Sequence, residues 1–250
     1  NIGLKNNLGL HLKNLNSLGK NDKQYKSSPQ LELQSLLELR SDLPLIKISE
    51  NNSHTLIPKL SIRINPSDMK DHSSDERRIN TSNIFDLNRF GIDDSFESGY
   101  STTLGIDYNS KNLSDDQNYL ELKLATVIRN DNESKIPTQT SLNKKNSNLF
   151  GSMDYKISEL INIDYDFAMD NHYENFEYNS FGIDLSMNNF VTSFNFLEEN
   201  NDSGSANVLE NKTIFNINNQ NSLSFKTRRN RKINLTEYYD LVYEYNNDCL

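Results

Sequence analysis

Residues 160–170 read LINIDYDFAMD and alternate between apolar and polar side chains. The side chains of Ile161, Ile163 and Tyr165 fall on one side, and those of Asn162 and Asp164 fall on the other. Successive side chains of a β-strand point to opposite faces, whereas a helix repeats every 3.6 residues, so this period of two indicates a strand. The stretch therefore predicts a strand with one apolar and one polar face.

The same period recurs along most of the chain, and it predicts about twelve strands of roughly ten residues each. That length is about what a tilted strand needs to span a membrane. Other stretches with this pattern are 56–64, 95–108, 120–128, 149–157, 181–187, 190–196, 209–217 and 236–245. We predict an all-β fold, an antiparallel up-and-down meander that forms part of a larger, incomplete transmembrane β-barrel. Alternation alone leaves a soluble sandwich or solenoid open.

The links between the predicted strands favour the barrel, because short and long links alternate. The long links are 66–94 and 131–146, while Asn188-Asn189 and residues 218–220 mark tight turns. Outer-membrane barrels have brief turns on one side and larger loops on the other. Asn suits such turns because it tolerates positive φ. We expect the long links to be polar outer loops and expect no compact core.

Composition excludes several classes of protein. The 250 residues carry a formal charge of −9 with a sequence pI of about 5.0, which argues against a basic nucleic-acid binder. Only 34% of residues are hydrophobic, and the longest apolar runs are stubs such as residues 43–46. These are far shorter than the roughly 18 residues of a transmembrane helix. A barrel accounts for the low hydrophobicity, because its apolar band faces lipid and its interior is polar.

The sequence gives an enzyme little support. The four histidines, His11, His54, His72 and His172, lie far apart and match no metal-ligand spacing. No phosphate-binding loop or nucleophile elbow occurs. We therefore expect no catalytic residue, no metal site and no cofactor. A serine and histidine pair built only in three dimensions stays open.

Two groups of charged residues are candidate ligand contacts. Asp164 and Asp166 share a face and could bind a cation, although carboxylates on a hydrated face are commonplace. Within an acidic chain, Arg228, Arg229, Arg231 and Lys232 form a basic cluster in a predicted loop at 228–234. Guanidinium groups bind phosphate well, so these four residues are candidate contacts for the phosphorylated saccharide of an outer-leaflet lipid. Ordinary solvated loop charge is the alternative.

Several stretches resemble the barrel of the lipopolysaccharide-assembly protein family. They are 56–66 (LIPKLSIRINP), 83–90 (NIFDLNRF), 91–99 (GIDDSFESG) and 235–245 (LTEYYDLVYEY) followed by 247–250 (NDCL). The resemblance implies an outer-membrane translocon for lipopolysaccharide (LPS), partnered by a lipoprotein plug and fed by a periplasmic transport bridge. It also implies that Cys249 forms a disulfide with a periplasmic domain outside these residues, and we expect residues 1–250 to be one partial barrel domain.

Two other functions remain open. The first is a general outer-membrane porin or receptor barrel. The second is an outer-membrane lipase, in which His172 would be required for esterase activity.

Overall fold

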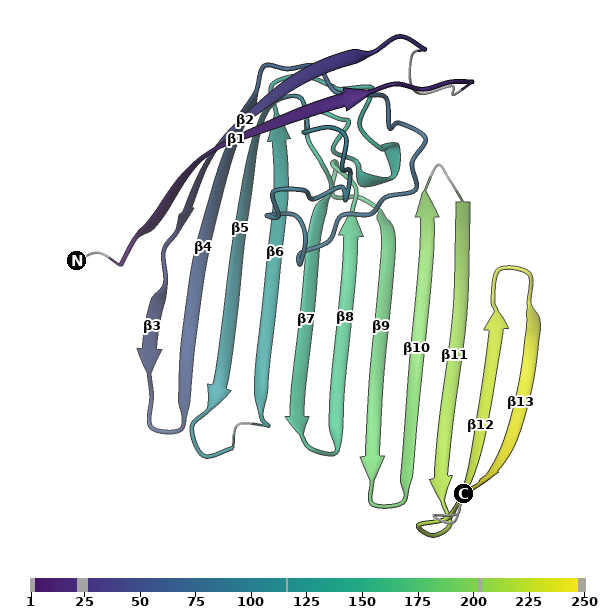
Figure 1. The fold of residues 1–250 in the computed structure, drawn as a ribbon. Helices are drawn as coiled ribbons and strands as arrows, with labels where there is room; N and C mark the ends of the chain where they lie inside the picture. The colour runs from purple at the N-terminus through teal and green to yellow at the C-terminus, as the bar shows by residue number, and fades with distance from the viewer. Residues whose placement is uncertain (1–2, 22–26, 116, 202–203, 247–250) are drawn as a thin grey trace. The chain divides into compact units, whose positions relative to one another are not determined.

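The computed structural model describes residues 3–21, 27–115, 117–201 and 204–246, and its fold is all-β. Thirteen strands form one sheet in the order β1-β2-β4-β5-β6-β7-β8-β9-β10-β11-β12-β13, with β3 paired to β4 (Figure 1). The sheet is not closed, because β1 and β13 stand at the two ends of this order. The predicted antiparallel meander is confirmed, with thirteen strands in place of about twelve.

The strands are β1 (Lys5–Ser17), β2 (Gln30–Asp42), β3 (Leu45–Ile48), β4 (Asn52–Asn65), β5 (Gly99–Asn112), β6 (Tyr119–Arg129), β7 (Leu149–Ser158), β8 (Ile161–Met169), β9 (Phe176–Met187), β10 (Phe190–Asn201), β11 (Gly204–Asn216), β12 (Asn221–Asn230) and β13 (Leu235–Tyr245). A short 3-10 helix, η1, spans Thr138–Thr140. None of the helical structure in the described residues is long and apolar enough to cross a membrane.

The sheet exposes its apolar face, and in unit 1 it buries polar side chains on the other face. In β5, Tyr100 and Leu104 are exposed, whereas Ser101 and Thr103 between them are buried. In β1, Leu8 is 69% exposed. A water-soluble sheet has the opposite arrangement, with its apolar side chains packed on a core. The alternation read from the sequence is therefore confirmed, and the exposed face is the apolar one.

The chain divides into two compact units, each described here by itself. Unit 1 comprises Asn1–Pro44, Ile57–Ile106 and Ala125–Asn148, and unit 2 comprises Leu45–Leu56, Asp107–Leu124 and Leu149–Leu250. The boundaries fall within β4, β5 and β6.

Unit 1 contains a local hydrophobic core that the sequence analysis did not predict. Its centre includes Ile84, Ile136 and Leu142, which are fully buried. These residues belong to the links 66–98 and 130–148, so the expectation that there is no compact core was wrong, while the position of the links on the outer side stays a prediction. The links are mostly irregular, and their apolar residues follow no regular period. They bury these side chains against each other and against the sheet, which gives the links a folded structure of their own.

The predicted strand at 95–108 begins later than expected, because β5 starts at Gly99. Gly99 has a φ of +81°, a left-handed conformation that favours glycine and interrupts the extended backbone. Residues 95–98 instead turn toward the rest of unit 1. The backbone N–H of Phe96 donates to Oε1 of Gln34 at 2.7 Å, and Lys13 lies over the Phe96 ring.

Unit 2 contains β7 to β13 joined by short turns. Asn188 and Asn234 adopt positive φ at the β9–β10 and β12–β13 connections, as expected of asparagine in turns. The predicted basic loop at 228–234 is shorter than expected, because Arg228 and Arg229 lie within β12. A register shift falls between these two arginines, which breaks the simple alternation there.

Candidate functional site

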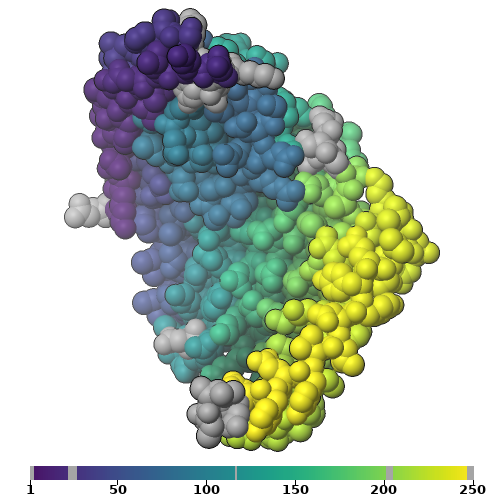
Figure 2. Space-filling view, turned by 45° about the vertical axis from the view of Figure 1, so that its right-hand side comes forward, coloured from purple at the N-terminus to yellow at the C-terminus, as the bar shows by residue number. Residues whose placement is uncertain are grey.

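Two links of unit 1 cover the polar face of the sheet. We call residues 66–98 the long segment and residues 130–148 the short segment. The long segment connects β4 to β5, and the short segment connects β6 to β7. In the space-filling view the long segment forms a closely packed mass next to the purple residues of β1 and β2 (Figure 2).

A buried cluster of five charged side chains joins the long segment to the sheet. Its members are Glu38 of β2, Arg63 of β4, Arg129 of β6, and Arg89 and Glu97 of the long segment. The strand members reach the segment because they lie on the polar face of the sheet. We call these five residues the arginine cluster.

Arg89 and Glu97 form the centre of the cluster. Nε of Arg89 donates to Oε2 of Glu97 at 2.7 Å, and a terminal nitrogen donates to Oε1 at 2.6 Å. This is the bidentate geometry in which a guanidinium group binds a carboxylate most strongly. Arg89 also donates to the hydroxyls of Thr103 at 3.0 Å and Ser101 at 3.3 Å. These polar residues of β5 therefore hold an arginine of the segment.

Arg129 and Arg63 extend the cluster from the sheet into the segment. Arg129 donates to Glu97 and to the carbonyl oxygen of Ser98. Arg63 donates to Glu38 at 2.9 Å and to the carbonyl oxygens of Phe85 and Asp86 at 3.0 and 2.7 Å. Three guanidinium groups thus fix both ends of residues 85–98 to the polar face.

Glu97 is ionised despite its burial. Burial by itself raises the pKa of a carboxyl group, but the charges of Arg89 and Arg129 lower the pKa of Glu97 to about 2. The cluster therefore contains three cations and two carboxylates, and it carries one excess positive charge at neutral pH.

The long and short segments also hold each other. The ring nitrogens of His72 lie 2.9 Å from carboxylate oxygens of Asp75 and Asp94, and the His72 backbone N–H donates to the carbonyl oxygen of Lys135. Lys135 Nζ is paired with Asp68, and Ser98 donates to Glu133 at 2.7 Å. The two segments therefore form one connected cover.

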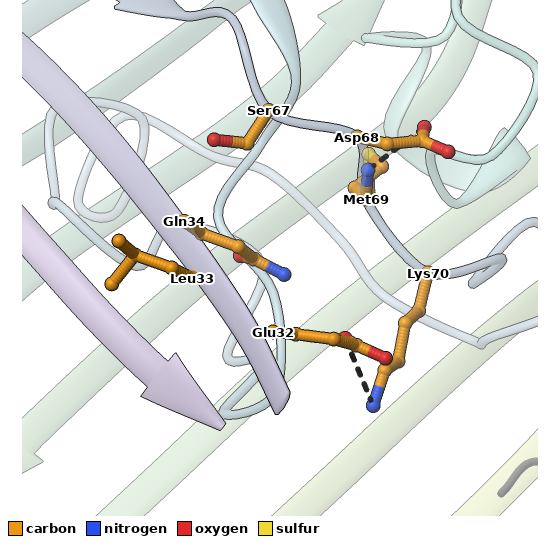
Figure 3. Close-up of a pocket in the computed structure, with 7 residues that line it drawn as sticks. All are labelled: Glu32, Leu33, Gln34, Ser67, Asp68, Met69 and Lys70. Carbon is orange, nitrogen blue, oxygen red and sulfur yellow. Dashed lines mark hydrogen bonds and ion pairs between the residues drawn. The ribbon is translucent and has the colours of Figure 1, made fainter. Parts of the chain in front are cut away.

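A cavity of about 410 Å³ lies between β2 and the start of the long segment (Figure 3). Nζ of Lys70 lies 3.8 Å from a carboxylate oxygen of Glu32 and 3.7 Å from one of Asp94. Gln34 lies on the β2 side of the cavity and donates to the carbonyl oxygen of Asp94 at 3.4 Å. The contacts of Lys70 with Glu32 and of Gln34 with Asp94 join β2 to the long segment. The cavity therefore lies at the junction of the strand and the segment.

The comparison with family models decides what kind of protein carries this arrangement. The model described as LptD, LPS transport system D, matches residues 5–235. The chain belongs to this family. No curated protein matches the chain.

Membership in the LPS transport system D family gives the chain a role in LPS transport and assembly, with LPS as the substrate and the LPS transport components as partners. The family belongs to the outer membrane, and it is a transport family rather than an enzyme family. The suspected resemblance is thus confirmed over most of the chain.

In this LPS transport system D member, the four basic residues predicted as lipid contacts have different partners. Arg228 lies between Glu210 and Glu237, at 2.8 and 2.7 Å, and is therefore engaged by carboxylates. The guanidinium carbon of Arg231 lies 5.6 Å from the centre of the Phe196 ring. Arg229 donates to Asn234 at 2.5 Å, and Lys232 donates to Ser205.

The remaining predicted residues fall in different places. Cys249 lies outside the described residues. His11 lies in the middle of β1, His54 lies near the start of β4, and His172 lies in the β8–β9 turn. Asp164 and Asp166 share the polar face of β8, as predicted, and no group of three or more potential metal ligands occurs among the described residues.

Sequence reasoning missed the arginine cluster entirely. Arg63 and Arg129 sit at polar positions of alternating strands, where an ordinary hydrated side chain is the simplest interpretation. The only available signal was the pairing of such strand arginines with carboxylates on the adjoining link, as with Glu97 of the 91–99 motif.

Proposed function

We propose that the chain forms part of the outer-membrane translocon that inserts LPS into the outer leaflet. The observation that carries this proposal is the inverted sheet, apolar outside and polar inside, in a member of the LPS transport family. Side chains such as Leu104 would contact hydrocarbon, while the polar face would line a hydrated passage for the saccharide. No covalent chemistry is needed, because transport requires a passage and an exit.

The long and short segments would block this passage in unit 1. The long and short segments occupy the polar face of unit 1, where the arginine cluster holds them. A saccharide cannot pass along a face that is filled by packed residues such as Ile84 and Ile136. Transport along this face of unit 1 therefore requires the segments to move.

The partners follow from the same proposal. A periplasmic bridge would deliver LPS, and a lipoprotein plug would occupy the barrel. Cys249 would form the disulfide with the periplasmic domain. At the end of β12 and in the turn after it, Arg229, Arg231 and Lys232 would contact phosphates of the outer-leaflet lipid, together with the carboxylate-bound Arg228.

Depletion of the full-length protein in its own Gram-negative cell tests the function. We expect LPS accessible to antibody at the cell surface to fall and LPS to accumulate in the inner membrane. Re-expression should restore the surface LPS. Unchanged surface LPS, combined with slower uptake of small hydrophilic solutes, would contradict the proposal and favour a porin. Esterase activity that is lost in a His172→Ala variant would favour the lipase.

A further inference from the structure

The arginine cluster has a surplus of positive charge and of donors. Three buried guanidinium groups meet only two carboxylates, Glu38 and Glu97. Among the described residues, Nε of Arg129 has no hydrogen-bond partner, although the side chain is only 2% exposed. A buried cation without full compensation is unfavourable and favours binding of an additional anion.

The chemistry of the cluster indicates which anion fits it best. A guanidinium group presents a planar fork of donors that matches carboxylates and phosphates, and a phosphate offers more oxygens and more charge than one carboxylate. Glu97 now bridges Arg89 and Arg129. A phosphate group on Arg129 could accept from the nitrogen that now donates to Glu97 and also from the unused Nε of Arg129.

We propose that the arginine cluster is a latch that phosphate opens: a phosphate group of the transported glycolipid replaces Glu97 on Arg129 and releases the Glu97 end of the long segment from the sheet. This inference rests on the proposed function and adds the chemical group that triggers it. Glu97 and its partner Arg89 both belong to the segment, whereas Arg129 belongs to β6. Exchange of one ligand for the other therefore breaks a bond between segment and sheet.

The direction of the effect follows from linkage. The buried cluster of the closed arrangement leaves phosphate no place, so phosphate binds the released arrangement better. A ligand that binds only the open state raises the open population by a factor of one plus its concentration divided by Kd. At about ten times Kd, the open population rises about tenfold.

Hydrogen–deuterium exchange of the full-length protein in detergent micelles measures the opening of the long segment. One arm compares sodium phosphate with sodium chloride at equal ionic strength. A second arm compares micelles that contain a phosphorylated glycolipid with micelles that contain the same glycolipid after removal of its phosphates. We expect exchange at residues 84–98 to rise about tenfold with phosphate, from either source, and to stay unchanged in the matched controls.

Three variants sharpen this test. Glu97→Gln removes the bridging carboxylate, so the segment should exchange rapidly even without phosphate and respond little to it. Arg129→Lys keeps the charge but loses the fork, so its response to phosphate should weaken. Glu159→Gln, in the exposed β7–β8 turn, removes the same charge and should behave as the wild type.

Equal exchange in phosphate and chloride, together with equal exchange in both glycolipid arms, would overturn the latch. A Glu97→Gln variant that responds like the wild type would also overturn it. If Glu97→Gln does not fold, the wild-type titration and Arg129→Lys still decide. The exchange experiment and the depletion experiment are independent. Loss of surface LPS on depletion, combined with a long segment whose exchange does not respond to phosphate, would refute only the latch. Unchanged surface LPS on depletion, combined with a phosphate-sensitive segment, would refute only the transport function.

Discussion

The two units each contain an arrangement of arginine and glutamate, and the two arrangements differ mainly in burial. In unit 1, Arg89 and Arg129 share Glu97, and none of the three side chains is more than 6% exposed. In unit 2, Arg228 lies between Glu210 and Glu237, and these side chains are 33–39% exposed. The residue types and distances are similar, while the access of water differs.

This difference decides what each arrangement can do. Water screens the Arg228 pairs, and exposed ion pairs of this kind contribute about 0–1 kcal/mol. Removal of one partner from a buried pair leaves an uncompensated charge and costs about 3–5 kcal/mol. The buried cluster can therefore hold a folded segment in place, whereas the exposed one adds little to stability.

The largest expected effect comes from Arg89→Met, which leaves Glu97 buried beside fewer cations. We expect the free energy of opening of the long segment to fall by about 3–5 kcal/mol. The matched change in unit 2, Arg228→Met, should lower the stability of β11 to β13 by at most about 1 kcal/mol. Hydrogen exchange of both variants in micelles measures the two effects. Equal costs in the two units would remove the distinction between them.

A second prediction concerns pH. The pKa of Glu97 is about 2 in the folded protein, below the ordinary value of 4.5. The unfolded state therefore binds the proton more readily, and Glu97 stabilises unit 1 fully above pH 4.5. This contribution, about 3 kcal/mol, should be lost as the pH falls from 4.5 toward 2. Hydrogen exchange of the long segment, measured at pH values from about 6 to about 3, gives its free energy of opening. This free energy should fall more steeply with decreasing pH in the wild type than in Glu97→Gln. Equal slopes in the two proteins would contradict the assignment.

The smallest expected effect has the opposite sign. In unit 2, Asp154 and Asp164 lie directly opposite each other on β7 and β8, and both point to the polar face. Like charges in this position destabilise a sheet, so Asp164→Asn should stabilise β8 by about 0.5 kcal/mol. Exchange of β8 amides measures the change, with Glu159→Gln as the control. Loss of a carboxylate would thus weaken unit 1 and strengthen unit 2. A destabilised β8 would show that Asp164 has a favourable partner.

The sheet could be predicted from the sequence because its information is local. Alternation in stretches such as 160–170 determines which side chains share a face, and asparagines such as Asn188 mark the turns. These features depend on neighbours along the chain. The meander and the exposure of the apolar face followed from them directly.

The arginine cluster could not be predicted, because its contacts join residues that are distant in sequence. Glu38 and Arg63 are 25 residues apart, and Glu97 and Arg129 are 32 apart. A strand arginine has the same local pattern whether water or a folded segment covers it. The apolar residues of the long segment, such as Ile84, follow no period that would reveal a buried core.

The central claim is that the apolar face of the sheet contacts hydrocarbon and that the polar face of unit 2 contacts water. Spin labels attached at single cysteines test it in the full-length protein reconstituted in vesicles, in a background without other cysteines. A label at Ile163 should collide with oxygen dissolved in the lipid, and a label at the neighbouring Asp164 should collide with a water-soluble nickel complex. This preference should alternate along residues 161–169. Labels that are equally accessible to the aqueous reagent at both positions would contradict the account.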